Sequence, residues 1–516
     1  RAFKPMVAGS NPVAGTRSKM FAPMRPVALA SAVFALLLSA CDTGPTFSTP
    51  ASPSPFFKSG SLIWYGCGGS FECTSVAVPL DYSNPARGAI NIAVSRVRAT
   101  STSERIGSLL INPGGPGTSG VDFLRNLGAR ELSLLGRRFD LVSFDPRGVG
   151  RSSPVQCLSN AQRDASALVD PVLDDPQEKQ EFLANTQAFV RGCQEKSGRL
   201  LPFVDTASAA RDLDAIRVAL GEKQLTYLGF SYGTFLGEVY AHLYPTHIRA
   251  MALDGVVDST VPGPDWLVGR AKGLEANLQA FFAYCLLRTS CLLGSTGDPS
   301  GRLTAFLRRL DSSPLPVRGR KMSRGMALVA ISSNVIFPSA WDGLSSALNA
   351  AAEGDGSALM LIYDTVVGRR ANGSYSGAGD ATVAINCIDD RPIYTDSASY
   401  ENLGEQLTRA STIFGPALQY SLFACSTWPV NTKHLDDLAV VGAPSILLIG
   451  ATGDPLTPAG YALSVSKRVA GSVVLIRAGV GHLSYDKSLC VQVAVDAYLT
   501  DLTIPAPGTI CPTDAF

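Results

Sequence analysis

A serine flanked by glycines stands at the centre of the segment Leu225-Thr-Tyr-Leu-Gly-Phe-Ser-Tyr-Gly-Thr-Phe-Leu-Gly-Glu-Val-Tyr240. The segment predicts a buried strand, a tight turn at Ser231, and then a helix with small residues on its inner face. Gly229 and Gly233 suit this turn, because a serine at its apex leaves no room for bulk two positions before and after it. At the positive end of the helix, Ser231 is suited to attack a carbonyl group.

A general base for Ser231 can be chosen among the four histidines of the chain. His482 follows the apolar run 472–477 in a glycine-bearing loop, from which an imidazole can reach back over a sheet. The other three are His242, His247 and His434. The first two lie on or near the helix behind Ser231 and the third lies in a polar run, so we expect His482 to be the base.

Asp454 is the candidate to orient the imidazole of His482. It follows the apolar run 445–449, in a loop that Pro455 ends. Its rivals are Asp436, Asp437 and Asp486. None of them follows a buried strand in this way. The resulting order of serine, aspartate and histidine along the chain is the order found in α/β-hydrolases.

A glycine-rich loop, Pro113-Gly-Gly-Pro-Gly117, follows the apolar run 108–112. The stretch from Gly115 to Gly120 also fits the dinucleotide pattern G-x-G-x-x-G, with Asp145 as a ribose ligand. Two prolines in the loop argue against that alternative. We favour an oxyanion-hole loop, in which the backbone N–H groups of Gly115 and Tyr232 hold the developing negative charge.

Strand and helix patterns alternate over most of the chain. Apolar or alternating runs predict strands at 75–80, 89–97, 108–112, 139–144, 225–228, 250–254, 445–449 and 472–477. The alternation stops between about residue 259 and residue 433. We therefore predict an α/β class protein with an α/β-hydrolase fold, a mostly parallel central sheet and an inserted, mainly helical cap domain. The predicted core spans 59–258 and 434–516, and the predicted cap spans 259–433.

The N-terminal part has the pattern of an export signal. Basic residues precede the apolar run 27–38, which is too short for a comfortable membrane span. The run ends in Leu38-Ser-Ala-Cys41, which resembles a bacterial lipobox; the alternative is an ordinary signal peptide with an incidental cysteine. We expect a signal peptide at 1–41, lipidation of Cys41, and a Ser/Thr/Pro-rich tether at 42–58. The protein would be lipid-anchored on the outer face of the cytoplasmic membrane, or secreted.

The composition agrees with an exported enzyme. The 516 residues are 46% hydrophobic and carry a net charge of +1, so nothing indicates a nucleic-acid partner. Without Cys41, ten of the eleven cysteines remain, and an even number suggests disulfides. The closest pairs are Cys67 with Cys73 and Cys285 with Cys291; Cys157 with Cys193 is a further candidate. Their spacing does not match a zinc site, so neither metal nor cofactor is expected.

Several motifs together resemble the secreted tripeptidyl aminopeptidases of actinobacteria, α/β-hydrolases related to prolyl aminopeptidases. They are Asn112-Pro-Gly-Gly-Pro-Gly117, Asp145-Pro-Arg-Gly-Val-Gly150, Arg211-Asp-Leu-Asp214, Gly229-Phe-Ser-Tyr-Gly-Thr234, Leu253-Asp-Gly-Val-Val257, Gly453-Asp-Pro455 and Gly481-His482. The resemblance covers about residues 64–511. It implies a serine exopeptidase that removes short peptides, tripeptides in this branch, from free N-termini. Pro113 replaces the histidine that prolyl aminopeptidases carry there, and Leu483 stands where a glycine is common.

An exopeptidase must bind an ammonium group, which requires carboxylates at the closed end of its cleft. Asp389 and Asp390, beside Cys387 in the predicted cap, are candidates; the alternative is that both are solvated surface charges. Asp254 and Glu238 are weaker candidates, because roles in the fold explain them equally well. Two other functions stay open: an exported esterase, which would ignore a blocked N-terminus, and an inactive surface lipoprotein, which a fluorophosphonate would not label at Ser231.

Overall fold

A computed structural model describes residues 62–514 of the chain, apart from 391–393, 395 and 436. The predicted signal peptide (1–41), the lipidation site Cys41 and the tether (42–58) lie outside the described residues. Within these residues, no helix has both the length and the apolar character needed to cross a membrane.

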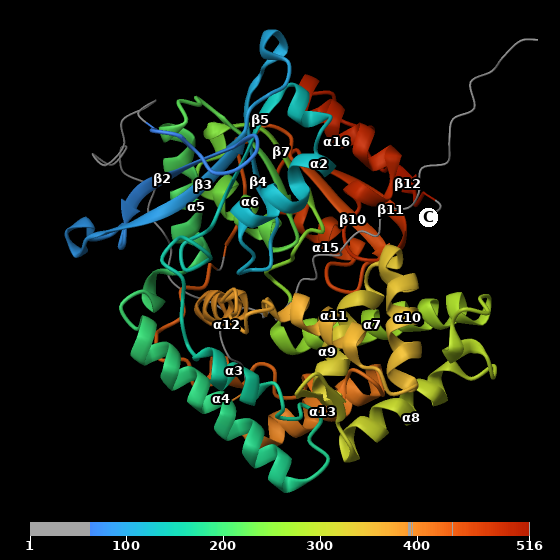
Figure 1. Ribbon diagram of the computed structural model, residues 1–516. Helices are drawn as coiled ribbons and strands as arrows, with labels where there is room; N and C mark the ends of the chain where they lie inside the picture. Colours follow the sequence, from blue (N-terminus) through green and yellow to red (C-terminus); the bar gives the residue numbers. More distant parts are fainter. Residues whose placement is uncertain (1–61, 391–393, 395, 436, 515–516) are drawn as a thin grey trace, which may run out of the picture. The chain divides into compact units, whose positions relative to one another are not determined.

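Ten strands of the described chain form one mixed sheet, in the order β1-β2-β3-β5-β4-β6-β7-β10-β11-β12 (Figure 1). They are β1 (Tyr65–Gly66), β2 (Phe71–Pro79), β3 (Ala89–Val97), β4 (Gly107–Asn112), β5 (Phe139–Phe144), β6 (Leu225–Phe230), β7 (Ile248–Asp254), β10 (Leu447–Gly453), β11 (Val473–Val480) and β12 (Ile510–Pro512). The pairs β1–β2, β2–β3 and β3–β5 are antiparallel, and all the pairs from β5 across the sheet to β12 are parallel. The predicted mostly parallel sheet is confirmed.

Helices cover both faces of this sheet. As a result, the central strands β4, β5 and β6 are buried along their whole length. Neighbouring side chains point to opposite faces. Leu110 packs on the face covered by α5 (Thr206–Ala219), α6 (Tyr232–Leu243) and α15 (Ala459–Val465). Leu109 and Ile111 pack on the other face, with α16 (Leu489–Asp501) and residues 124–135.

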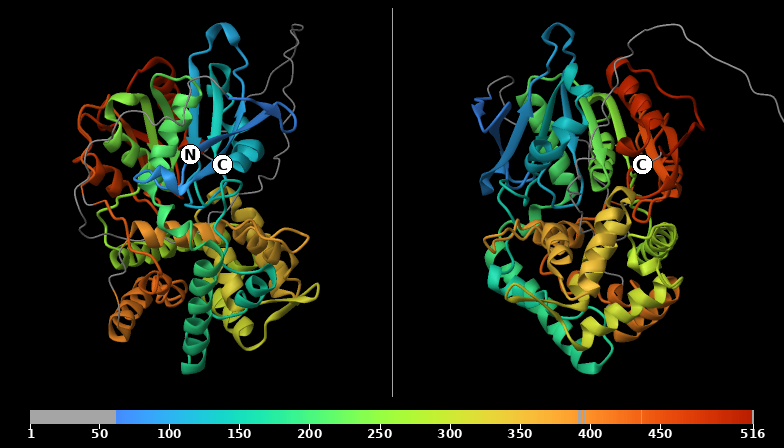
Figure 2. Two further views of the ribbon diagram at one scale, coloured as in Figure 1. Left: turned by 90° about the vertical axis from the view of Figure 1, so that its left-hand side faces the viewer. Right: turned by 45° about the vertical axis from the view of Figure 1, so that its right-hand side comes forward.

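Between β7 and β10 the described chain is mainly helical. This insertion contains α7 (Gly263–Leu286), α8 (Pro299–Ser312), α9 (Arg324–Val335), α10 (Trp341–Ala352), α11 (Ser357–Val367), α12 (Ala378–Asp389), α13 (Ser397–Ala410), α14 (Phe423–Ser426) and the hairpin β8 (Leu315–Val317) and β9 (Arg320–Met322). Its helices gather beyond one end of the parallel strands rather than on a face of the sheet (Figures 1 and 2). The predicted helical cap is confirmed; its boundaries, 259 and 433, stay a prediction.

The segment before α4 (Pro176–Ser197), which lies within the predicted core range 59–258, is bonded to residues of the cap. Arg324 of α9 pairs with Asp170 (2.9 Å), and Arg369 pairs with Asp164 (2.7 Å). These pairs join segments about 150 to 200 residues apart in the chain, which local sequence patterns cannot predict.

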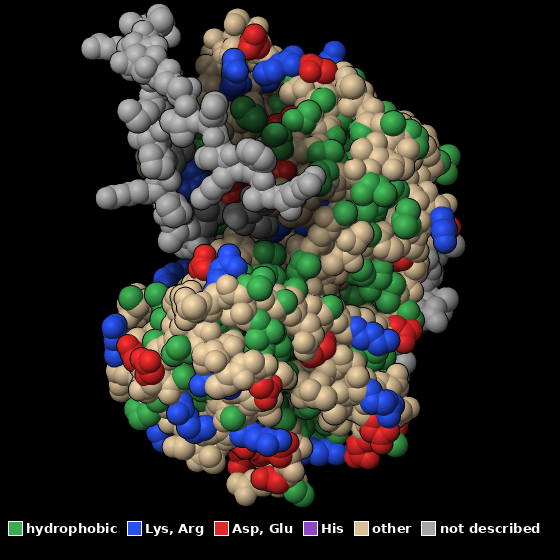
Figure 3. Space-filling view, turned by 90° about the vertical axis from the view of Figure 1, so that its right-hand side faces the viewer, with side chains coloured by type: hydrophobic (Ala, Val, Ile, Leu, Met, Phe, Trp, Pro, Cys, Tyr) green, Lys and Arg blue, Asp and Glu red, His purple; other side chains and the backbone are tan. Residues whose placement is uncertain are grey.

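Five disulfides join the cysteines of the described chain: Cys67–Cys73, Cys157–Cys193, Cys285–Cys291, Cys387–Cys425 and Cys490–Cys511. The three predicted pairs are confirmed, and the other two join cysteines 21 to 38 residues apart. On the face in Figure 3, acidic and basic side chains are intermingled rather than separated by sign.

A buried ion pair fixes the turn after β5 to α5. Both side chains, Arg147 and Asp212, are fully buried. Arg147 donates twice to the Asp212 carboxylate (2.6 and 2.7 Å), and its other three N–H groups donate to backbone carbonyl oxygens. Every donor of the guanidinium is therefore used, which offsets the cost of burying the charge.

Replacing Asp212 by alanine is expected to lower the free energy of unfolding by about 3–5 kcal/mol, because Arg147 would stay buried without its counterion. The matched control is Asp501→Ala, which removes an exposed pair with Arg138 (2.7 Å). That change should cost less than about 1 kcal/mol. Urea unfolding of both variants with disulfides intact tests this; equal shifts of the midpoint would contradict it.

Candidate active site

Ser231 lies at the turn between β6 and α6, with backbone angles of φ 53° and ψ −123°. A positive φ is rare for a residue with a side chain and indicates a strained turn. A side-chain atom at Gly229 would lie 2.4 Å from the carbonyl oxygen of Gly233, so packing requires a glycine there, as the sequence predicts. The Ser231 amide donates to the carbonyl oxygen of Asp254 (2.9 Å), which holds the turn against β7.

Asp454 and His482 meet beyond the ends of β10 and β11. His482 Nδ1 is 2.8 Å from Asp454 Oδ2 and 3.0 Å from Oδ1, and both side chains are fully buried. The Asp454 carboxylate also accepts from the amides of Leu456 and Thr457 (2.9 Å each) and of Leu483 (3.2 Å). Burial raises the pKa of Asp454, but the interaction with His482 and these hydrogen bonds outweigh burial and lower the pKa below its ordinary value.

An ionised Asp454 can only accept hydrogen bonds, so His482 Nδ1 carries the proton and Nε2 of the neutral ring is an acceptor. His482 Nε2 and Ser231 Oγ are both buried and have no hydrogen-bond partner among the described residues. The structure does not join these two atoms by a hydrogen bond. Gly255 lies close to both residues. It follows Asp254, whose carbonyl oxygen accepts from the Ser231 amide, and a side-chain atom at Gly255 would lie 3.4 Å from His482 Cε1. Such hydrogen bonds are often long before substrate binds.

The other candidates for base and acid have different surroundings. His242 Nδ1 lies 2.9 Å from the Ala439 carbonyl oxygen, His247 Nδ1 lies 3.1 Å from Asp214 Oδ1, and His434 Nδ1 lies 3.0 Å from the Asp389 carbonyl oxygen. Asp437 accepts from the Ala439 amide (3.0 Å), Asp486 pairs with Lys487 (2.6 Å), and Asp436 lies outside the described residues. Of the three described candidates, Asp437, Asp454 and Asp486, the structure brings Asp454 to His482.

The glycine loop after β4 lies against the turn at Ser231. A side-chain atom at Gly114 would lie 3.1 Å from Ser231 Cβ and 3.0 Å from the backbone nitrogen of Tyr232. The Gly114 amide is already used, because it donates to Asn112 Oδ1 (2.8 Å). Tyr232 is the first residue of α6, so its amide has no acceptor within the helix. The amides of Tyr232 and Gly115 are therefore the candidates to hold an oxyanion.

The Asp145 carboxylate joins its own loop to the start of α1 (Gly120–Phe123). It accepts from Ser119 Oγ (2.6 Å) and from the amides of Val121 (3.1 Å) and Arg151 (2.8 Å). This arrangement does not fit the ribose contact that the dinucleotide alternative requires.

Two buried charged residues hold the loop of His482, and the sequence analysis did not assign either of them this role. Arg477, which is fully buried, donates to the carbonyl oxygens of Gly481 (2.8 Å) and Leu483 (3.0 Å). Asp254 Oδ2 accepts from two backbone amides just beyond the loop (2.9 Å each). An arginine at the end of an apolar strand is the signal that could have identified Arg477.

At the C-terminal end of α12, Asp389 is linked to the residue after Ser231. Its two carboxylate oxygens accept from the amide (2.9 Å) and the hydroxyl (2.6 Å) of Thr206, and that hydroxyl lies 2.5 Å from the Tyr232 hydroxyl. Asp390 follows at the C-cap of the helix. Within the described residues, no hydrogen bond or ion pair reaches the Asp390 carboxylate.

Neither carboxylate is solvated, since Asp389 is 9% exposed and Asp390 is 8% exposed. Burial raises the pKa of Asp389 to about 8. Burial, and then the charge of Asp389, raises the pKa of Asp390 well above its ordinary value. The negative end of α12 disfavours both charges further. A buried acidic pair of this kind destabilises the fold, and such pairs are typical of functional sites.

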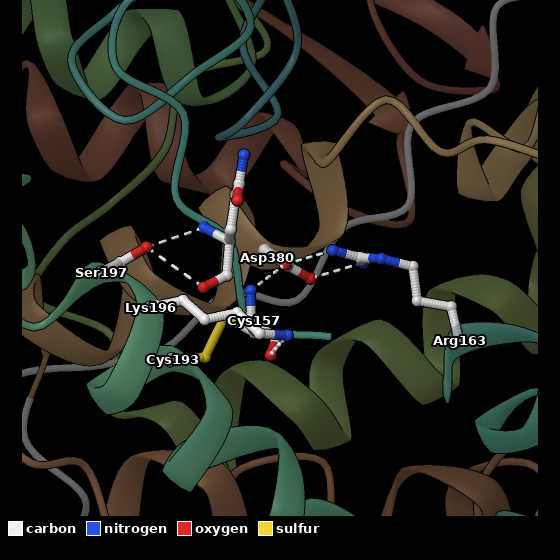
Figure 4. The surroundings of a disulfide bond; sticks show 7 residues. Cys157, Arg163, Cys193, Lys196, Ser197 and Asp380 are labelled. Atoms are coloured by element: carbon white, nitrogen blue, oxygen red, sulfur yellow. Dashed lines mark hydrogen bonds and ion pairs between the residues drawn. A yellow bond between two sulfur atoms is a disulfide. The ribbon is translucent and has the colours of Figure 1, made fainter. Parts of the chain in front are cut away.

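The other end of α12 is fixed to the segment of a disulfide. The Asp380 carboxylate, 1% exposed, accepts from the Cys157 amide (2.6 Å) and from the Arg163 guanidinium (Figure 4). Two residues further along, Thr382 Oγ1 donates to the Pro116 carbonyl oxygen in the glycine loop (2.5 Å). Thus α12 contacts the glycine loop at one end and the residue after Ser231, through Thr206, at the other.

Residues 107–488 match the profile of the alpha/beta hydrolase fold family. The chain belongs to this family. It is 33% identical over 465 residues to the serine protease Hip1 of Mycobacterium tuberculosis, covering 86% of this chain and 88% of Hip1. It is 30% identical over 457 residues to the tripeptidyl aminopeptidase of Streptomyces lividans, covering 85% and 83%. It is also 33% identical over 463 residues to carboxylesterase B of M. tuberculosis, covering 85% and 86%.

These relatives place the chain in the actinobacterial tripeptidyl aminopeptidase-like group, as the sequence motifs predict. It is a serine hydrolase of the peptidase type.

Proposed function

We propose that this peptidase is an exported serine exopeptidase that releases short peptides, tripeptides by preference, from free N-termini. The observation that carries the proposal is the buried pair Asp389 and Asp390, of which Asp389 is connected through Thr206 by two hydrogen bonds to Tyr232, the residue after Ser231. An exopeptidase needs a buried acidic pair in this position to bind the substrate ammonium group. An endopeptidase or an esterase does not bind a free N-terminus and does not need such a pair.

The chemistry follows from Ser231, His482 and Asp454. His482 Nε2 takes the proton of Ser231 Oγ, and the oxygen attacks the substrate carbonyl carbon. Asp454 keeps the imidazole in the required tautomer, and the amides of Tyr232 and Gly115 hold the oxyanion. His482 then gives its proton to the leaving amine. Water, activated by the same histidine, hydrolyses the acyl-enzyme.

The preference for tripeptides is supported by the similarity to the tripeptidyl aminopeptidase of Streptomyces lividans. We assign the primary ammonium contact to Asp390, because Thr206 already donates to both oxygens of Asp389, whereas no described group donates to the Asp390 carboxylate.

Export is proposed on the sequence pattern alone. The signal at 1–41 would direct the chain out of the cytoplasm, and acylation of Cys41 would anchor it to the outer face of the cytoplasmic membrane.

The direct test uses the chain from residue 42 and compares a free tripeptide amide carrying a chromophore with its N-acetylated twin. We expect cleavage of the free form and loss of at least about 100-fold in kcat/KM for the acetylated form, because a buried carboxylate would lose its counterion. Equal cleavage of both would exclude the exopeptidase. It would favour an exported esterase or general serine hydrolase, the second candidate, which the similarity to carboxylesterase B supports.

A further inference from the structure

One face of cap helix α7 covers the loop that carries Asp454. Gly273 and Asn277 follow Trp266 by seven and eleven residues, a spacing that places all three on the same side of the helix. Gly273 packs directly on Pro455, since a side-chain atom at Gly273 would lie 2.5 Å from Pro455 Cα. The cap therefore contacts the backbone of the Asp454 loop without intervening side chains.

Asn277 makes a hydrogen bond across this contact. It is 2% exposed, and its Nδ2 donates to the carbonyl oxygen of Gly273 in its own helix (3.0 Å) and to that of Gly453 at the end of β10 (3.0 Å). Both partners are acceptors, so the orientation of the amide is fixed by its surroundings. Its Oδ1 has no partner among the described residues. Burying the Oδ1 atom without a hydrogen-bond partner costs free energy of folding. This cost indicates that the bond from Nδ2 to Gly453 has a functional role.

The Gly453 carbonyl oxygen is the point where the cap meets both loops. Besides Asn277, it accepts from the amide of Gly481 (3.1 Å). Gly453 directly precedes Asp454, and Gly481 directly precedes His482. One cap side chain is thus bonded to the carbonyl that joins the two loops.

Two further hydrogen bonds connect the cap to the same loops. Trp266 Nε1 donates to the carbonyl oxygen of Leu456, two residues after Asp454 (3.3 Å). The amide of His482 donates to the carbonyl oxygen of Ile336, which follows α9 (2.9 Å).

We propose that Asn277 is a positioning residue through which the cap sets the geometry of the Asp454–His482 pair, with Trp266 as a second support. The inference rests on the proposed roles of Asp454 and His482. The cap then has a part in the chemistry besides enclosing the substrate: its docking on the core holds the acid and base loops together.

The test is Asn277→Ala in the chain from residue 42. The matched control is Asn334→Ala, which removes another buried cap amide (5% exposed) that donates to its own helix at Ala330 (2.9 Å). We expect Asn277→Ala to lower kcat about 10- to 100-fold with KM changed less than about threefold, because loose loops misplace the base. The rate of fluorophosphonate labelling at Ser231 should fall in the same proportion, since this probe has no peptide N-terminus. Asn334→Ala should change neither quantity more than about threefold.

Trp266→Phe provides a second variant if Asn277→Ala does not fold. It keeps an aromatic side chain and removes the N–H donor to Leu456. Its control is Trp341→Phe, which removes a buried cap indole donor to Val335 (3.1 Å). We expect a loss of about three- to tenfold in kcat and in labelling for Trp266→Phe alone.

The outcomes separate this inference from the proposed function. A wild-type enzyme labelled at Ser231, with Asn277→Ala or Trp266→Phe no slower than its control, would overturn the positioning role alone. A wild-type enzyme that is not labelled at Ser231 would overturn the proposed function, and the inference with it.

Discussion

Replacing Ser231 by alanine is expected to lower kcat for peptide hydrolysis by about 10⁶-fold, because no other group can form the acyl-enzyme. Asp454→Asn should cost about 10⁴-fold, since an asparagine amide would leave His482 in the wrong tautomer. Both rates can be measured with the free tripeptide amide, and fluorophosphonate labelling followed by mass spectrometry identifies the reacting residue.

The matched control for Ser231→Ala is Ser95→Ala. Ser95 Oγ on β3 is also buried and without a partner among the described residues, but it belongs to a different part of the sheet. Ser95→Ala should keep full activity. Peptide hydrolysis that survives in Ser231→Ala, or labelling of another residue, would show that Ser231 is not the nucleophile.

The longer strands of the sheet could be predicted from sequence because each of them leaves a local signal. The alternating run 89–97 predicts β3 to the residue, and the continuous apolar run 139–144 predicts β5 equally well. The run 445–449 starts two residues before β10 and ends four residues before the strand does, because pairing with β11 continues through Gly453, where the side chains no longer show the pattern. Two short edge strands, β1 and β12, have no such signal and were not predicted.

The meeting of Asp454 and His482 could also be predicted, because residues that follow parallel strands gather at one edge of the sheet. The sequence could not predict which cap residues reach that edge. Asn277 stands in the middle of a long helix, and only the docking of α7 on Pro455 brings its amide to Gly453. The burial of Asp389 and Asp390 is equally a product of tertiary packing, since adjacent aspartates in a sequence usually indicate a solvated surface.

Replacing Asp390 by asparagine is expected to lower kcat/KM for the free tripeptide amide by about 10²- to 10³-fold, because the substrate ammonium would be buried without a counterion. The change should leave fluorophosphonate labelling of Ser231 unaffected, since this probe carries no ammonium group. Asp389→Asn should cost less, because Thr206 already donates to both oxygens of Asp389. Glu401→Gln on α13, which removes an exposed carboxylate, controls for a general change of charge.

The pH dependence provides an independent measurement of the same contact. Burial raises the pKa of Asp389 to about 8 and raises that of Asp390 as well, so the pair favours its protonated form at neutral pH. Binding an ammonium ion then favours release of a proton, so kcat/KM for the free tripeptide should rise more steeply with pH than the labelling rate does. Above about pH 8 the substrate amine itself loses its charge, and kcat/KM should fall. Asp390→Asn should remove the extra rise; an unchanged profile in this variant would place the ammonium group elsewhere.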